Sequence, residues 1–272
     1  MQQLPPLAEL LNTYEIGEMA KRKLDAATWA VLAPADRKAF DRITFRPRMM
    51  VNTTKLDLTL ELFGQKHFAP IIVGPVSHQK RFHPEGELEM AKGAAAAKAM
   101  MVMTEVATPA SWYQGPEMKK AIDAGCKVIV CGKVVPKGLN VPIVVKGVMT
   151  VLEAEAAIAA GAQGIIVSNY QTTHKMEPIE ALPLIADAVK GRIPILVDGG
   201  FRRGSDVLKG LALGAKAVLV ARAPACGLAA YGAAGVQRAI EILQTDLGRD
   251  MAMCGKVNLD ALGRDTVKIH RF

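Results

Sequence analysis

The chain has 272 residues, of which 50% are hydrophobic and only 5% aromatic, and its formal net charge is +8. No apolar run approaches the roughly 18 residues of a membrane span, and the N-terminus lacks a signal core, so we expect a cytoplasmic protein without a membrane partner. The cations of the first fifty residues, Arg37 and Lys38 among them, are not interleaved with aromatics, which indicates a solvated face and no nucleic-acid partner. The four cysteines form no C-x-x-C pair, so no metal is expected.

Residues 1–64 are predicted to form a helical and hairpin extension. Tyr14 to Leu24 is amphipathic and follows a possible cap at Asn12-Thr13, and a second short helix is expected from Pro34 through Phe40. Leu56 to Phe63 alternates as a strand does and ends at Gly64, which indicates one arm of a hairpin that closes the floor of the domain.

Residues 65–272 repeat a strand-and-helix unit. Three strands open with Pro-Ile, at Pro70, Pro142 and Pro194. Three more follow a glycine that ends a helix, the usual joint of a parallel sheet, at Gly125, Gly161 and Gly214. With Met100 to Met103, seven strands alternate with helices near 84–98, 117–124, 151–160, 178–189 and 205–213. The pattern predicts an α/β fold, a (β/α)₈ TIM barrel in a single domain of residues 1–272, whose ligand face is formed by the C-terminal strand ends.

Two intervals are too short for a regular barrel. Residues 105–126 would have to hold a helix, a strand and another helix, and Ser111 to Gln114 is only a stub of that strand. Residues 132–141 are too few for a helical crossover. We therefore expect a shortened or irregular wall around residues 105–141, and a homo-oligomer or partner subunit that covers the apolar surface left there.

An anion site is predicted where two neighbouring strands end. A buried strand stops at Asp198-Gly199-Gly200, and glycines let a backbone turn tightly beside a ligand. Ser205-Asp206 is expected to cap the helix that follows. The next strand delivers Ala221-Arg222 to the same end, so backbone N–H groups, a helix N-terminus and the guanidinium groups of Arg202 and Arg222 would converge on a phosphate. The alternative is a glycine turn with solvated arginines.

Several motifs resemble the FMN-dependent α-hydroxy acid oxidase and dehydrogenase family, which includes glycolate oxidase, lactate oxidase and mandelate dehydrogenase. The most specific motif is Asp198-Gly-Gly-Phe-Arg-Arg-Gly-Ser-Asp206. Others, spread over nearly the whole chain, are Ala39–Ile43, Phe45–Arg48, Phe63–Gln65, Gly74-Pro75, His83–Glu87, Pro142–Gly147, Gly164–Asn169 and Gly227-Leu-Ala. The resemblance implies a TIM barrel that binds FMN.

The resemblance also implies roles for individual residues. Gly200, Arg202 and Arg222 would hold the FMN phosphate, Asp198 the ribityl hydroxyls, and Lys146 the flavin edge, where a cation stabilises the reduced, anionic flavin. Ala221 stands where the family usually has glycine. Further cofactor-binding residues are expected at strand ends and in flanking loops, namely Pro75, Val76, Ser77, Thr104, Gln114, Ser168 and Gly199.

The catalytic residues of the family are replaced. Tyr170 stands where the family has its histidine base, and Thr173 where it has the arginine that binds the substrate carboxylate. The early active-site tyrosine has no counterpart in Trp29–Pro34, Val134 replaces the aspartate that partners the histidine, and the long lid loop is absent. His174 is the one nearby replacement base, but no neighbouring residue visibly orients it, so a surface role is the simpler interpretation.

The sequence leaves three functions open. The first is an FMN-dependent oxidoreductase that acts on a different, bulkier or protein-bound substrate or on a redox partner, with Lys146, Tyr170 and His174 as candidate catalytic residues. The second is a flavin-binding subunit with little catalysis of its own. The third is a flavin-free barrel enzyme that uses the anion site for a phosphorylated metabolite.

Overall fold

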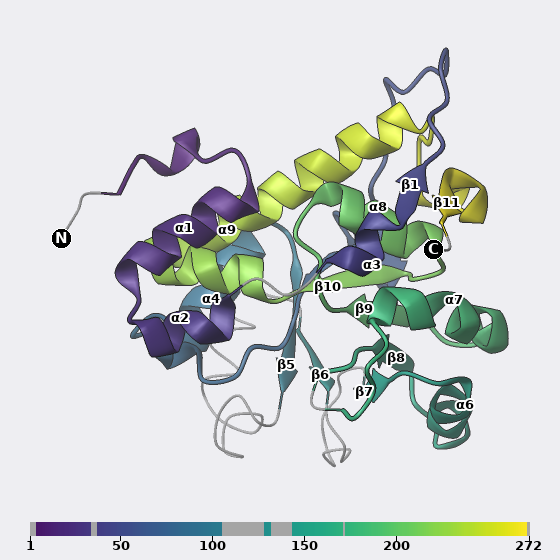
Figure 1. Cartoon of the computed structure of the whole chain (residues 1–272), viewed down its shortest axis with the longest axis horizontal. Helices are drawn as coiled ribbons and strands as arrows, with labels where there is room; N and C mark the ends of the chain where they lie inside the picture. Colours follow the sequence, from purple (N-terminus) through teal and green to yellow (C-terminus); the bar gives the residue numbers. More distant parts are fainter. Residues whose placement is uncertain (1–3, 34–36, 105–127, 132–142, 171, 271–272) are drawn as a thin grey trace.

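The computed structural model describes residues 4–33, 37–104, 128–131, 143–170 and 172–270. Within these residues, parallel strands close into a barrel in the order β10-β4-β5-β6-β7-β8-β9 (Figure 1). They are β4 (Ile71–Val73), β5 (Met100–Thr104), β6 (Val128–Cys131), β7 (Ile143–Val148), β8 (Gly164–Val167), β9 (Ile195–Asp198) and β10 (Ala217–Val220). The TIM-barrel prediction is confirmed, with seven strands in the described part of the chain.

Most of the predicted thin wall lies outside the described residues. This applies to the strand stub Ser111 to Gln114 and to the helix expected at 117–124. β5 and β6 nevertheless pair directly, from Met101↔Val128 to Thr104↔Cys131. The oligomer or partner subunit expected to cover this wall therefore stays a prediction.

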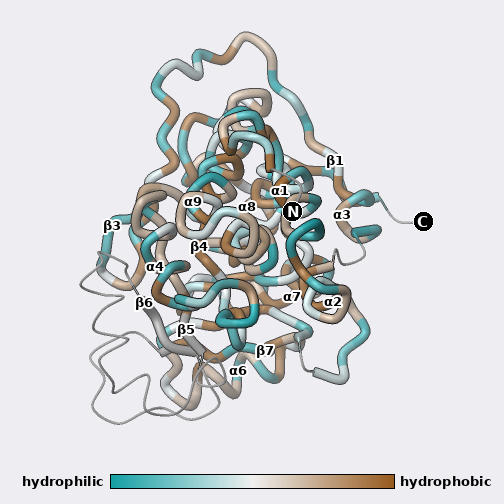
Figure 2. Tube along the Cα trace, turned by 90° about the vertical axis from the view of Figure 1, so that its left-hand side faces the viewer, coloured by the Kyte–Doolittle hydropathy of each residue, from teal (hydrophilic) through white to brown (hydrophobic). Residues whose placement is uncertain are grey.

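The strands are short apolar runs because both of their faces are buried. Alternate residues point to opposite faces of a strand, so Ile72, Leu196 and Leu219 pack inside the barrel. Their neighbours Ile71 and Val197 belong to the larger core between the barrel and its helices. Figure 2 shows such hydrophobic stretches inside the molecule, for example at β4.

The helices around the barrel largely follow the predicted ranges. They are α4 (Gly86–Ala96), α6 (Val151–Ala159), α7 (Pro178–Val189) and α8 (Gly204–Ala212); a further helix, α9 (Arg222–Met253), follows β10. Helix α8 begins before the predicted cap pair Ser205-Asp206, because the Asp206 carboxylate accepts hydrogen bonds from the backbone N–H groups of Arg202 and Arg203 (2.9 and 2.8 Å). No described helix is long and apolar enough to cross a membrane.

Helix α9 was not predicted, because its alanines and glycines carry no clear apolar period. It is two helices joined at Gly232, whose φ of 63° and ψ of −145° are not helical. The two halves approach closely: a Cβ on Gly227 would lie 2.3 Å from the Gly235 carbonyl oxygen. Helix α1 (Thr13–Lys23) packs along α9 (Figure 1).

The N-terminal extension contains α1, α2 (Ala26–Leu32) and α3 (Lys38–Asp41). The predicted cap of α1 is confirmed: the Asn12 side chain accepts from Tyr14 and Glu15 N–H groups, both at 3.0 Å. After α3, strand β1 (Ile43–Phe45) pairs antiparallel with β11 (Val267–Ile269). Short 3₁₀ turns complete the described elements at Leu7–Glu9, Gln79–Arg81, Leu259–Ala261 and Arg264–Thr266.

A hairpin closes the barrel floor, as predicted, although its first strand is shorter than expected. Strands β2 (Leu60–Leu62) and β3 (Gln65–His67) pair antiparallel. Leu60 and Leu62 pack against side chains inside the barrel. The hairpin therefore closes the interior of the barrel at this end, and the C-terminal strand ends are the candidate ligand face.

Candidate functional site

Lys146, Ser168 and Asp198 meet at the C-terminal ends of the adjacent strands β7, β8 and β9. The Lys146 ammonium donates to Ser168 Oγ at 2.6 Å and lies 2.6 Å from Asp198 Oδ2. Tyr170 lies beside this group: its backbone N–H donates to Ser168 Oγ (3.3 Å), and Lys146 Nζ is 5.5 Å from its ring centroid. The structure therefore brings these four predicted site residues together.

The predicted convergence of two strand ends is also present. We call Asp198–Arg203 the glycine loop; Gly199 and Gly200 in it have φ angles of 115° and 79°, which favour glycine. The loop residues from Asp198 to Arg202 line one small cavity of about 30 Å³ together with Ala221 and Arg222. Arg222 is the first residue of α9, so a second helix N-terminus points to the same place.

Arg202 has buried hydrogen-bond donors without a partner in the described part of the chain, which indicates that an anionic ligand binds here. Its side chain is buried, with 6% of the residue exposed, and its Nε and Nη1 atoms have no hydrogen-bond partner among the described residues. Burial lowers the pKa of the Arg202 guanidinium from its ordinary value. A buried cation without acceptors is costly, so a phosphate that supplied oxygen atoms here would fit these donors.

Arg37 is a site residue that sequence analysis missed. It was expected on a solvated face, and this prediction is wrong. Its guanidinium forms a two-bond ion pair with Asp206, at 2.6 Å (Nη1–Oδ2) and 2.7 Å (Nη2–Oδ1), and Asp206 is fully buried. The partners are 169 residues apart in the chain, so no local pattern could have paired them.

His174 has an orienting partner, which corrects the sequence-based expectation. Its Nε2 lies 3.0 Å from Glu153 Oε1, on the first turn of α6. Burial acts to raise the pKa of Glu153, but hydrogen bonds from the Met149 N–H, from His174 and from Thr150 outweigh it and lower that pKa. His174 and Glu153 therefore form a histidine–carboxylate pair beside the strand ends.

The remaining predicted residues are placed only in part. Pro75, Val76 and Ser77 follow β4 at the ligand face and are half-buried. Thr104 is the last residue of β5, at the same end of the barrel. Gln114 lies outside the described residues.

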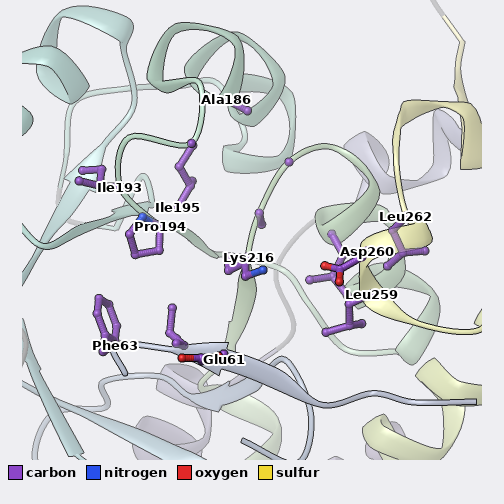
Figure 3. A pocket seen from close by; sticks show the side chains of 15 residues that line it. Glu61, Phe63, Ala186, Ile193, Pro194, Ile195, Lys216, Leu259, Asp260 and Leu262 are labelled. Atoms are coloured by element: carbon purple, nitrogen blue, oxygen red, sulfur yellow. The ribbon is translucent and has the colours of Figure 1, made fainter. Parts of the chain in front are cut away.

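A larger cavity of about 680 Å³ lies at the opposite end of the barrel (Figure 3). Phe63, Pro194, Ile195 and Lys216 line it, at the hairpin and at the N-terminal ends of β9 and β10. It contains none of the predicted site residues. Because ligands of TIM barrels bind at the C-terminal strand ends, size alone does not make this cavity the site.

The fold agrees with the comparisons with known proteins. A model of the FMN-dependent dehydrogenase family matches residues 24–111 and 133–269, and the chain belongs to this family. FMN is the cofactor of the family.

Named relatives include a peroxisomal (S)-2-hydroxyacid oxidase of Arabidopsis thaliana, 32% identical over 85% of this chain and 86% of its own. Glycolate oxidase of Spinacia oleracea is 29% identical over 95% of this chain and 96% of its own. Among solved structures, a mandelate oxidase variant with 2-hydroxy-phenylacetamide has a TM-score of 0.82 and 27% identity, over 97% of this chain and 100% of its own. A flavocytochrome b2 variant has a TM-score of 0.83 and 25% identity, over 98% and 88%.

Proposed function

We propose that this protein is an FMN-dependent oxidoreductase whose substrate is a hydroxy compound bulkier than the small α-hydroxy acids, and without their carboxylate. FMN, when bound, supplies the acceptor for the substrate's hydride. Family membership disfavours the flavin-free alternative. The chain's own residues would bind the cofactor, orient the substrate and accept a proton.

The observation that carries the proposal is that the loop between β8 and α7 has neither a base nor a cation at the two positions where the family has them. Tyr170, at the position of the family's histidine base, is 64% exposed, and its hydroxyl has no hydrogen-bond partner among the described residues. Thr173, at the position of the family's carboxylate-binding arginine, is exposed and uncharged. Loss of a general base typically costs about 10²–10⁴-fold in rate, and a small carboxylate without a cation would also lose its orientation.

His174 is the proton acceptor that the geometry favours over Tyr170. An imidazole accepts protons near neutral pH, and a carboxylate on one ring nitrogen fixes its tautomer and stabilises its cation. Glu153 occupies that position, with its other oxygen held by the backbone N–H groups of Met149 and Thr150 (2.8 and 2.9 Å). This arrangement supports His174 as the base and Glu153 as its positioning residue.

The proposal is tested by anaerobic reduction of the bound flavin, followed by its visible absorbance. Glycolate, L-lactate and L-mandelate should leave the flavin oxidised, while dithionite bleaches it. Mandelamide and methyl mandelate, which keep the hydroxyl but lack the charge, are the matched probes for the missing carboxylate site. Tyr170→His alone should not restore bleaching by the acids.

Each result decides between functions. Bleaching by the uncharged probes and not by mandelate supports the proposal. Rapid bleaching by any of the three acids overturns it and returns the protein to hydroxy acid oxidation. If none of a wide set of hydroxy compounds reduces the flavin and only dithionite bleaches it, the result favours the flavin-binding subunit.

The role of His174 needs a separate experiment. The ¹⁵N NMR chemical shifts of its ring nitrogens should change in Glu153→Gln, since the carboxylate that fixes the imidazole tautomer is gone. Thr150→Ala is the matched control, because Thr150 caps the same helix turn through the Glu153 N–H without touching His174. Equal shifts in both variants would assign Glu153 to helix capping only.

A further inference from the structure

The N-terminal extension braces the glycine loop from several sides. The Thr13 hydroxyl donates to the Arg202 carbonyl oxygen at 2.6 Å, and the Tyr14 ring lies 5.2 and 5.3 Å from the guanidinium carbons of Arg202 and Arg203. Arg222 donates to the Ala33 carbonyl oxygen at 2.9 Å. The residues expected around a phosphate are therefore held by a part of the chain that lies outside the barrel.

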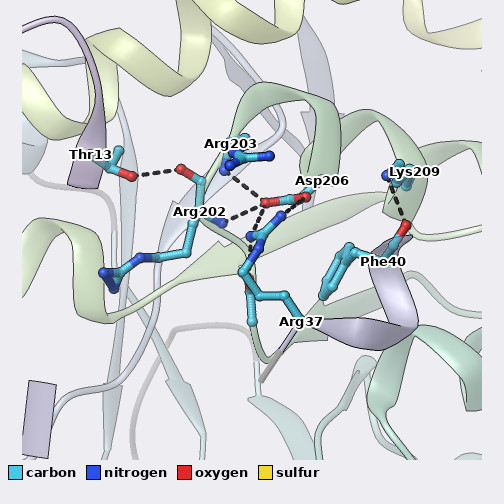
Figure 4. Close-up of polar contacts among 8 residues, drawn as sticks. Thr13, Arg37, Phe40, Arg202, Arg203, Asp206 and Lys209 are labelled. Carbon is cyan, nitrogen blue, oxygen red and sulfur yellow. Dashed lines mark hydrogen bonds and ion pairs between the residues drawn. The ribbon is translucent and has the colours of Figure 1, made fainter. Parts of the chain in front are cut away.

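Arg37 makes the most specific of these contacts (Figure 4). Besides its two bonds to Asp206, Arg37 Nη1 donates to the Gly200 carbonyl oxygen at 3.2 Å. Asp206 Oδ2 accepts the backbone N–H groups of Arg202 and Arg203. Arg37 is thus joined to three residues of the loop: to Gly200 directly, and to Arg202 and Arg203 through the buried Asp206 carboxylate.

The aromatic ring of Phe40 fixes the other side of Gly200. A Cβ on Gly200 would lie 2.9 Å from Phe40 Cε2, and Phe40 packs edge-on against Phe201 with 5.0 Å between centroids. The Arg37 guanidinium lies 5.4 Å from the Phe40 ring centroid. Arg37 and Phe40 together hold Gly200 at its positive φ, in the conformation that turns the loop toward Arg202 and Arg222.

The Arg37–Asp206 pair also sets the charge balance of the loop. Asp206 is fully buried and would be an uncompensated carboxylate without Arg37. The hydrogen bonds that Arg37 donates to Asp206 raise the pKa of Arg37 above its ordinary value. With Asp206 neutralised by Arg37, the positive charge of Arg202 and Arg222 stays available for an anion.

We infer that Arg37 is a positioning residue for the cofactor phosphate: it holds the glycine loop in the conformation in which Gly200, Arg202 and Arg222 converge. It does not touch the phosphate itself. This inference rests on membership of the FMN-dependent family and is independent of which substrate the enzyme oxidises.

The test compares FMN with riboflavin, which lacks the phosphate, on apoprotein titrated by flavin fluorescence. Arg37→Lys keeps the charge but cannot make the two-bond fork and the Gly200 contact together. We expect Arg37→Lys to raise the Kd for FMN about tenfold, because one charge-assisted hydrogen bond that orders the loop is lost. The Kd for riboflavin should stay unchanged. Arg42→Met is the matched control, since Arg42 lies on the same segment in an exposed pair with Glu180.

The preference for FMN over riboflavin separates positioning from general stability. A fall in that preference for Arg37→Lys and not for Arg42→Met supports the inference. An unchanged preference, whether both affinities fall or neither does, overturns it and leaves Arg37 a structural residue. Arg37→Met alone would leave the buried Asp206 carboxylate without its cation and could prevent folding. The double variant Arg37→Met/Asp206→Asn removes both charges together and is used in its place.

Discussion

Lys146 Nζ lies 2.6 Å from Asp198 Oδ2, so the cation expected beside the flavin is paired with the carboxylate expected beside the ribityl chain. Both side chains are largely buried, and Ser168 joins them as an acceptor for Lys146. The opposite charges of Lys146 and Asp198 compensate each other, so both can be buried at the strand ends without a large desolvation cost.

Removing this cation should make the bound flavin harder to reduce. In Lys146→Met the reduced, anionic flavin loses a neighbouring positive charge, and Asp198 is left without its partner. We expect the midpoint potential to fall by roughly 30–60 mV for the two-electron couple, measured by spectroelectrochemistry. Lys175→Met, which removes an exposed cation from the adjacent loop, should leave the potential unchanged. An unchanged potential in Lys146→Met would place the flavin elsewhere.

Two neighbouring arginines should differ in their effect on cofactor retention. Arg202 is buried with unsatisfied donors, whereas Arg203 is exposed. Arg202→Ala should raise the Kd for FMN by about 10- to 150-fold, as expected for a charge-assisted bond of about 1.5–3 kcal/mol, and purify largely as apoprotein. Arg203→Ala should retain flavin, as judged by the absorbance ratio at 450 and 280 nm. Full occupancy in Arg202→Ala would show that the phosphate lies elsewhere.

Two glycines should respond to alanine with opposite signs. A Cβ on Gly204 would lie 2.2 Å from the Leu247 nitrogen, so α8 and α9 would have to separate, and we expect a loss of about 3 kcal/mol. A Cβ on Gly248 in α9 would make ordinary contacts at 3.7 and 3.8 Å with Leu56 and Leu58. Gly248→Ala should therefore stabilise by about 0.5–1 kcal/mol through helix propensity. Urea unfolding measures both; similar losses would contradict the helix contact described for Gly204.

Asp250 should make stability depend on pH. Burial, and then the nearby Asp246, raise the pKa of Asp250 to about 6 in the folded protein, against an ordinary value of 3.8. The folded state thus binds this proton more tightly, so Asp250 costs stability increasingly as pH rises from about 4 to about 6, and fully above that. Asp250→Asn should raise the melting temperature at pH 8 and hardly change it at pH 4. Exposed Asp260→Asn is the control; a gain that is equal at both pH values would refute the assignment.

The barrel and part of its site could be predicted because their signals are local. Glycine and proline mark the strand starts, and neighbouring parallel strands must end together, so Lys146, Ser168 and Asp198 were predicted to share one edge. Arg37 and Glu153 could not be found in this way. Their partners Asp206 and His174 lie 169 and 21 residues away, and only the packed structure decides which charges meet.

The pairing of β1 with β11 has a consequence for how the protein is made. Ile43 pairs with Ile269, and Thr44 contacts His270 across 226 residues of chain. Contacts of such long range form late, because the intervening chain must first be ordered. During synthesis the segment after α3 cannot dock until residues 267–269 have left the ribosome. The contacts of the N-terminal extension with the glycine loop are therefore among the last to form, and we expect a nascent chain to bind FMN only after residues 267–269 have emerged.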